Sequence, residues 1–264
     1  MTDSTPSAPA LPAFEVIPAI DLLGGCVVRL EQGRYDRATV YDRDPAAVAR
    51  RFAETGAPRI HVVDLEGARA GRPVEVEAVR EIVAAVGGRP VQLGGGLRDR
   101  DAVEAALALG VQRVILGTAA LRHPEWVREV ARAHPGRIAV GIDAREGRVA
   151  VSGWLEESEV DAVELARCFE GAGVAALIHT DIARDGMRTG PNVEASRALA
   201  RAVRIPVIVS GGVGSLDHVI AAARGHGDGL GGVIVGRAIY TGDVDLADAL
   251  RGVQTALGEA EACS

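Results

Sequence analysis

The most unusual feature of this 264-residue sequence is the absence of lysine, since all 29 residues of the Lys+Arg total are arginine. Chemistry that needs a lysine amine is therefore excluded, including Schiff-base aldolases, pyridoxal phosphate enzymes and P-loop nucleotide binding. Aromatic residues make up only 3%, and 36 acidic residues give a formal net charge of -7. Because no cluster of arginines alternates with aromatic residues, we expect no nucleic-acid partner.

Cysteine is scarce as well. Cys26, Cys168 and Cys263 lie far apart, without a Cys-x-x-Cys pair or zinc-finger spacing, which indicates a reducing, cytoplasmic location and no metal site. Residues 1–13 lack the basic start and apolar run of a signal peptide, and no stretch reaches the roughly 18 apolar residues of a membrane span. We expect residues 1–13 to be a disordered tail, residues 258–264 to be a second tail, and the protein to be a monomer without membrane partners.

Hydrophobic residues are plentiful, at 48%, and they recur as short apolar runs rich in β-branched residues. These predicted strands cover residues 14–20, 59–63, 90–93, 113–116, 137–142, 175–179, 206–210 and 232–235. Segments with helical periodicity lie between them, so a parallel sheet covered by helices on both faces is expected. Eight such units favour a closed (β/α)8 TIM barrel. An open doubly wound sheet would carry a GxGxxG fingerprint after the first strand, where this chain reads DLLGGCVVRL.

Four motifs occur twice, in the same order and at a nearly constant offset. Residues 17–30 resemble 140–154, 60–76 resemble 177–195, 91–99 resemble 207–215, and 114–121 resemble 233–240. The sequence therefore predicts one barrel over residues 14–257 that consists of two fused (β/α)4 half-barrels, at about 14–135 and 136–257.

Acidic residues end several of the predicted strands, and strand ends form the active-site face of a (β/α)8 barrel. Asp21 and Asp143 end the first and fifth strands, Asp64 ends the second, and the sixth runs into Thr180 and Asp181. We expect four carboxylates at one mouth, with the first and fifth strands opposite each other. An opposed pair suits a general acid and a general base, although Asp at a strand end also commonly caps the following turn.

Glycine-rich turns follow the remaining four strands. They contribute Gly95, Gly96, Gly117 and Thr118 in the first half, and Gly211, Gly212, Gly236 and Arg237 in the second. Glycine lets a phosphate approach backbone N–H groups, and a following helix N-terminus adds a favourable dipole. A tight turn with positive φ would require glycine too. Because the pattern occurs twice, we expect two phosphate sites and a long bisphosphate substrate with its reactive centre between two carboxylates.

The segments IPAIDLLGGCVVRL, GGGLRD, GTAAL, GIDAREGRVAVSGW, HTDIARDGMRTGPN, SGGVGS and VGRAIY together resemble the phosphoribosylformimino-5-aminoimidazole carboxamide ribotide isomerases of histidine biosynthesis. The resemblance covers nearly the whole chain apart from its tails. It implies an Amadori rearrangement of an aminoaldose to an aminoketose, with no cofactor and no metal. It also implies that Asp21 is the proton acceptor and Asp143 the donor. The family's TDIxRDG motif carries Thr180 and Asp185 into the site, where Asp185 rivals Asp143 as the ring-opening acid.

Further residues allow two interpretations. Trp154 follows a predicted β-excursion and could stack on the planar imidazole carboxamide of the substrate or pack beneath the loop. Residues 24–44 form a long insert after the first strand, for which we expect a lid that orders over the ligand. His61 and His179 are expected at matching strand positions, either in the core or behind the groups that touch substrate.

Three alternative functions stay open. The cyclase subunit of imidazole glycerol phosphate synthase is similar but carries a lysine after the first strand, where this chain has Leu22, Leu23 and Gly24. The bifunctional actinobacterial isomerase that also serves tryptophan synthesis has an arginine two residues before the tryptophan, where this chain has Ser152. A non-catalytic sensor of sugar phosphates is compatible with the fold, but the acid, base and phosphate elements are all intact.

Overall fold

The computed structural model describes residues 13–31, 33–151 and 156–262, and its centre is a closed barrel of parallel strands. In order around the barrel these are β1 (Glu15–Leu23), β4 (Ile60–Asp64), β5 (Val91–Gly94), β6 (Arg113–Leu116), β7 (Ile138–Arg145), β10 (Ala176–Asp181), β11 (Val207–Ser210) and β12 (Leu230–Val235). The ring closes where β12 pairs with β1, from Glu15↔Gly232 to Pro18↔Val235. The predicted (β/α)8 barrel is therefore confirmed.

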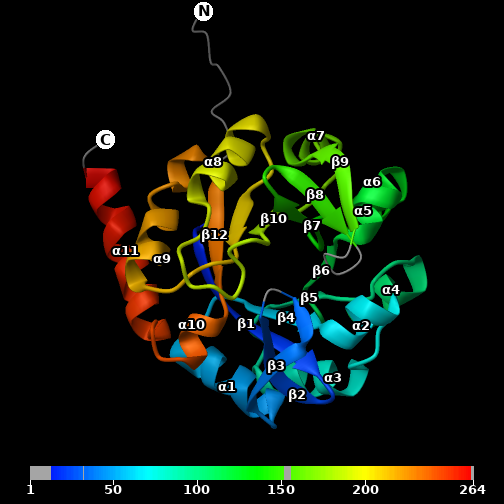
Figure 1. Ribbon diagram of the computed structural model, residues 1–264, viewed down its shortest axis with the longest axis horizontal. Helices are drawn as coiled ribbons and strands as arrows, with labels where there is room; N and C mark the ends of the chain where they lie inside the picture. Colours follow the sequence, from blue (N-terminus) through cyan, green and yellow to red (C-terminus); the bar gives the residue numbers. More distant parts are fainter. Residues whose placement is uncertain (1–12, 32, 152–155, 263–264) are drawn as a thin grey trace, which may run out of the picture.

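A helix follows each barrel strand and packs against the outside of the ring (Figure 1). These helices are α1 (Pro45–Thr55), α3 (Val76–Ala85), α4 (Arg100–Ala108), α6 (Pro124–Ala133), α7 (Ala162–Arg167), α8 (Val193–Ala202), α9 (Leu216–Ala223) and α11 (Leu246–Ala262), with a 3-10 turn, η1 (His226–Asp228), before β12. Side chains of Asp44, Asp99 and Asn192 accept hydrogen bonds from N–H groups of the first helical turn, as N-cap residues do. The last helix continues past residue 257, the expected end of the barrel. None of the described helices is both long and apolar enough to span a membrane.

Two hairpins extend the barrel strands beyond the mouth. β2 (Cys26–Glu31) and β3 (Arg34–Asp42) follow β1, whereas β8 (Arg148–Val151) and β9 (Glu156–Asp161) follow β7. Each hairpin pairs antiparallel with the end of its own barrel strand, and the two lie on different sides of the barrel in Figure 1. Since β1 and β7 are four strands apart, the hairpins repeat at the interval of the sequence repeat. The fusion of two half-barrels stays a prediction.

Three short helices were not predicted: α2 (Leu65–Ala70), α5 (Thr118–Arg122) and α10 (Arg237–Tyr240). All of them directly follow barrel strands, at the edge of the mouth. Segments of four to six residues are too short to show the periodicity from which a helix is recognised.

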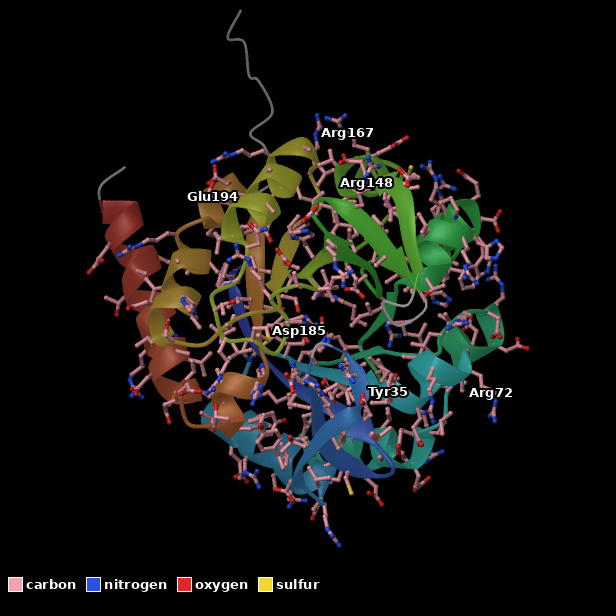
Figure 2. The ribbon with its side chains drawn as sticks, in the orientation of Figure 1. Tyr35, Arg72, Arg148, Arg167, Asp185 and Glu194 are labelled. Carbon is pink, nitrogen blue, oxygen red and sulfur yellow. The ribbon has the colours of Figure 1, made fainter. Side chains whose placement is uncertain are left out.

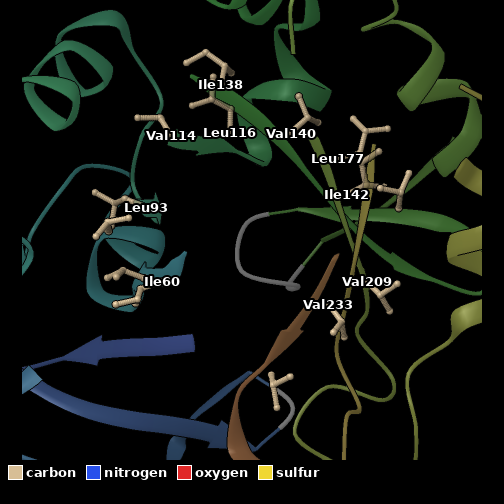
Figure 3. Close-up of a cluster of buried hydrophobic side chains, with 14 of the residues drawn as sticks. Ile60, Leu93, Val114, Leu116, Ile138, Val140, Ile142, Leu177, Val209 and Val233 are labelled. Carbon is tan, nitrogen blue, oxygen red and sulfur yellow. The ribbon is translucent and has the colours of Figure 1, made fainter. Parts of the chain in front are cut away.

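The core has two layers because successive side chains of a strand point to opposite faces. Outward side chains such as Val62, Leu116 and Val140 pack against the helices, and Figure 3 shows part of this layer. Inward side chains form a smaller cluster inside the barrel, made up of Ile17, Ala19, Ala139, Ala176, Ile178, Ile208 and Ile234. The same alternation directs Asp21, two residues after Ala19, into the barrel.

Candidate active site

A cavity of about 260 Å³ lies at the carboxyl ends of the barrel strands. Its walls include every predicted site residue that the structure describes: Asp21, Gly95, Gly96, Gly117, Thr118, Asp143, Thr180, Asp185, Gly211, Gly212, Gly236 and Arg237. The predicted stacking residue, Trp154, lies outside the described residues. Figure 2 shows Asp185 near the centre of the molecule and Arg72 at its periphery. The folding of the barrel thus brings residues from both sequence halves to one cavity.

The carboxyl group of Asp21 is buried, with 8% of the residue exposed. Burial raises the pKa of Asp21 to about 6; the cation of Arg29 opposes this rise, and the charge of Asp185 adds to it. A carboxylate with a pKa near neutrality can both accept and release a proton at physiological pH, which is what general acid–base chemistry needs.

Arg29, on β2, joins two of the carboxylates. Its Nη1 donates to Asp21 Oδ2 over 2.7 Å, and its Nη2 lies 3.6 Å from Asp185 Oδ1. Sequence reasoning did not find this residue. The available signal was a single charged side chain within the apolar run CVVRL, a pattern that indicates a buried charge with a partner.

Asp143 and Thr180 lie on neighbouring strands, paired in register between β7 and β10. Thr180 is buried, with 7% exposed, and Asp143 is half-buried. β1 and β7 are four positions apart in the ring, so Asp21 and Asp143 enter the cavity from opposite strands, as predicted.

The expectation of four strand-end carboxylates at the mouth is wrong for Asp64 and Asp181, neither of which lines the cavity. Asp64 pairs in register with the outward-facing Leu22. Its carboxylate accepts from the backbone N–H groups of residues 67, 74 and 75 over 2.6, 2.7 and 3.0 Å. Asp181 accepts from the Asn192 side-chain amide over 2.8 Å. Each of the two aspartates lies one residue beyond a side chain that points into the barrel, so it points outward and its carboxylate holds the following loop by hydrogen bonds. The third carboxylate of the cavity, beside Asp21 and Asp143, is Asp185.

The turns at Gly95 and Gly212 pack against neighbouring backbone so closely that no side chain fits. A Cβ at Gly95 would lie 2.1 Å from the carbonyl oxygen of Asp64, and one at Gly212 would lie 2.6 Å from that of Gly190. The φ angles of these two glycines are 103° and 82°. Loop packing thus requires glycine at positions that also line the cavity, which agrees with the tight-turn interpretation, and phosphate binding there stays a prediction.

Arg237 follows Gly236 at the start of α10, and its Nη1 donates to the carbonyl oxygen of Gly186 over 3.0 Å. A Cβ at Gly236 would come within 2.7 Å of Arg29 Cζ. The second pair of glycine turns is therefore in contact with the loop that carries Asp185 and with the arginine that holds Asp21.

Other cavity residues were not predicted. Tyr35 on β3 donates from its hydroxyl to the Leu65 carbonyl oxygen over 2.7 Å, Arg98 lies beside the first glycine turn, and Arg188 pairs with Asp243. These side chains come from the hairpin and the loops, whose paths follow from tertiary contacts. Because Tyr35 lines the cavity, the insert at 24–44 is part of the site; its ordering over ligand stays a prediction.

The expectation that His61 and His179 occupy matching strand positions is wrong, because His179 lies one residue beyond the position that corresponds to His61. His179 points outward and pairs through Nδ1 with Ser196 Oγ over 2.8 Å, so it is a core residue. His61 points inward and lines the cavity. The position that matches His61 in the second half is Ile178, not His179, since both lie in the interior layer of their strands.

The fold and the site together define a (β/α)8-barrel enzyme with a carboxylate-lined cavity at the carboxyl ends of its strands. The family model described as "Histidine biosynthesis protein" matches residues 15–245, and the chain belongs to this family.

The sequence is similar to proteins named 1-(5-phosphoribosyl)-5-((5-phosphoribosylamino)methylideneamino) imidazole-4-carboxamide isomerase, such as the following three. The protein of Rhizorhabdus wittichii is 59% identical over 89% of this chain and 97% of its own length. That of Gloeothece citriformis is 56% identical over 91% and 93%, and that of Sorangium cellulosum is 56% identical over 90% and 98%.

Proposed function

We propose that this protein is an aldose–ketose isomerase of histidine biosynthesis. It converts the aminoaldose form of a phosphoribosylformimino aminoimidazole carboxamide ribotide to the aminoketose, without a cofactor. The entry of Asp21 and Asp143 into one cavity from opposite barrel strands carries the proposal. The names of the similar isomerases support the substrate class, because the similarity extends over 97% and 93% of the lengths of two of them.

The two phosphates of the substrate would bind at the two glycine-rich rims. One rim consists of Gly95, Gly96, Gly117 and Thr118, and the other of Gly211, Gly212, Gly236 and Arg237. Backbone N–H groups at such turns suit an anion, and Arg237 adds positive charge to the second rim. Binding at both rims would hold the reacting ribose between the carboxylates.

The rearrangement requires one acid and one base. Asp143, or its rival Asp185, protonates the ring oxygen of the ribose as the C1–O bond breaks and the amine nitrogen forms a C=N bond to C1. Asp21 then removes the proton from C2, and the electrons of the C2–H bond form C1=C2 while the C=N pair returns to nitrogen. Transfer of a proton to C1 and loss of the hydroxyl proton at C2 give the ketone. The raised pKa of Asp21, about 6, leaves it ionised but basic near neutral pH.

Other elements of the proposal come from the sequence. Thr180 lies beside Asp143 and would orient the substrate there, and Trp154 is proposed to stack on the imidazole carboxamide. We also propose a cytoplasmic monomer that acts on a small molecule, without nucleic-acid or membrane partners.

A coupled assay with the aminoaldose bisphosphate, beside phosphoribosyl anthranilate, tests the proposal. Turnover of the first alone supports a single-substrate isomerase, turnover of both identifies the bifunctional alternative, and turnover of neither contradicts the proposal. Asp21→Asn should lose turnover by a factor of about 10³ while still binding the bisphosphate. Asp217→Asn, at an exposed position of α9, is the matched control and should keep full activity.

A further inference from the structure

Three polar side chains form a row along one side of the barrel interior, on three adjacent strands. His61 on β4, Gln92 on β5 and Arg113 on β6 are paired in register with one another. Gln92 is completely buried, and His61 lines the cavity. Neighbouring side chains in register lie close enough to interact directly, so this row reaches from the partly buried cation of Arg113 to the cavity.

The hydrogen bonds along the row run in one direction. Arg113 Nη1 donates to Gln92 Oε1 over 3.3 Å, and Gln92 Nε2 lies 2.9 Å from His61 Nδ1. Burial, with the charge of Arg59, lowers the pKa of Arg113 to about 10, so the guanidinium stays charged at neutral pH. Because a guanidinium only donates, the amide oxygen of Gln92 must face Arg113, and its NH2 group must face His61.

This direction fixes the tautomer of His61. Nδ1 accepts the hydrogen bond from Gln92, so the ring proton resides on Nε2. Burial and the charge of Arg29 lower the pKa of His61 to about 3, and the ring is neutral. Within the described part of the chain, Nε2 has no hydrogen-bond partner.

The corresponding row in the other half is apolar. Ile178 on β10, Ile208 on β11 and Gly232 on β12 are paired in register in the same way, and the two isoleucines belong to the interior cluster. A substrate with a phosphate at each end therefore meets a hydrogen-bond donor on one side of the barrel and hydrocarbon on the other.

We propose that His61 is a substrate-binding residue whose Nε2–H donates to an oxygen atom of the substrate, and that Gln92 and Arg113 are positioning residues that fix this tautomer. The inference rests on the proposed function, because the oxygen belongs to the bisphosphate held in the cavity. The donor distinguishes the two ends of that substrate and sets its direction in the site. His61 cannot act as a base, since its one lone pair is used by Gln92, so proton removal is left to the carboxylates.

The tautomer is measurable without any substrate. Two-bond ¹H–¹⁵N correlations of the six histidine rings, recorded between pH 6 and pH 8, should include one neutral ring that carries its proton on Nε2 throughout and disappears in His61→Gln. A proton on Nδ1, or an imidazolium in this range, would overturn the proposal. In Gln92→Leu, checked for folding by circular dichroism, the His61 signals should shift toward a mixture of tautomers.

The substrate contact is tested by kinetics. His61→Leu should raise KM about tenfold, as expected for one lost hydrogen bond in a closed site, while the pH dependence of kcat/KM stays that of the wild type. His61→Gln retains an N–H donor and should recover most of the affinity. Equal KM values in wild type and His61→Leu contradict the contact. If the wild type does not convert the aminoaldose at all, the proposed function is wrong. The tautomer of His61 is tested separately, by the NMR spectra, and does not depend on this result.

Discussion

Arg29 and Asp21 form an ion pair inside the barrel mouth, with 2.7 Å between Nη1 and Oδ2 and only 11% of either side chain exposed. The same guanidinium reaches Asp185, so one cation lies between two carboxylates. Burial disfavours the charge of Asp21, and the ion pair favours it. The balance sets the pH at which this carboxylate can accept a proton.

The pH profile of kcat/KM should report this balance. Because a base must be ionised, kcat/KM should fall about tenfold per pH unit below an apparent pKa of about 6. Arg29→Met removes the charge that lowers the pKa of Asp21, so its acidic limb should move to higher pH. Asp185→Asn removes a charge that raises this pKa, so its limb should move to lower pH. Shifts in the same direction in both variants would contradict the assignment.

Asp21 should also couple stability to pH. Its pKa is higher in the folded state, about 6 against 3.8, so the folded protein binds more protons between these values. The stabilisation is complete below the lower pKa and is lost as the pH rises through 6. Relative to Asp21→Asn, the wild-type free energy of unfolding should fall by about 1 kcal/mol between pH 5 and pH 7. Denaturant unfolding at the two pH values measures this change, and a constant difference would speak against it.

Asp64 should matter for stability rather than for chemistry. In Asp64→Ala, two buried backbone N–H groups and a partly buried one lose their acceptor, and we expect a loss of about 3 kcal/mol in the free energy of unfolding. Asp181→Ala is the matched comparison, because Asp181 is only half-buried and accepts from a single backbone N–H group and the Asn192 amide. The loss in the free energy of unfolding should be smaller in Asp181→Ala than in Asp64→Ala. Equal losses in thermal or denaturant unfolding would show that burial of the acceptor is not the cause.

The glycine rims should be sensitive to a single methyl group. Gly96→Ala and Gly212→Ala place a Cβ within 2.5 and 2.6 Å of backbone atoms at φ angles of 73° and 82°. Both rims must shift, so KM for the bisphosphate should rise at least about tenfold. Gly87 has φ 59° with open space around it, so Gly87→Ala should cost about 1 kcal/mol of stability and leave KM unchanged. Wild-type KM in the two rim variants would exclude these loops as phosphate sites.

The local pattern of apolar and polar residues was sufficient to predict the barrel strands. Apolar β-branched runs predicted the strands to within a few residues at their ends, because strands buried on both faces must be apolar throughout. The hairpin over 26–42 was expected only as an insert. Its β3 strand is largely exposed, so it carries no hydrophobic signal.

For the site, the sequence by itself determined that Asp21, Asp143, Thr180 and the glycine turns come to the cavity, because they end or follow buried strands and the ends of parallel strands must meet. Asp185, beyond the end of its strand, was predicted only from the resemblance to the family motif. Only the tertiary structure decided which way side chains at neighbouring positions face. His61 faces the cavity whereas His179, shifted by one position along its strand, faces the helices. In the same way Asp21 faces the cavity whereas Asp64, which pairs with the next residue, Leu22, faces outward. The structure also placed Arg29 between Asp21 and Asp185, and Gln92 beside His61. The contacts of Arg29 with Asp185 and of Gln92 with His61 join segments that are distant in the sequence, so they leave no periodic signal within any one strand.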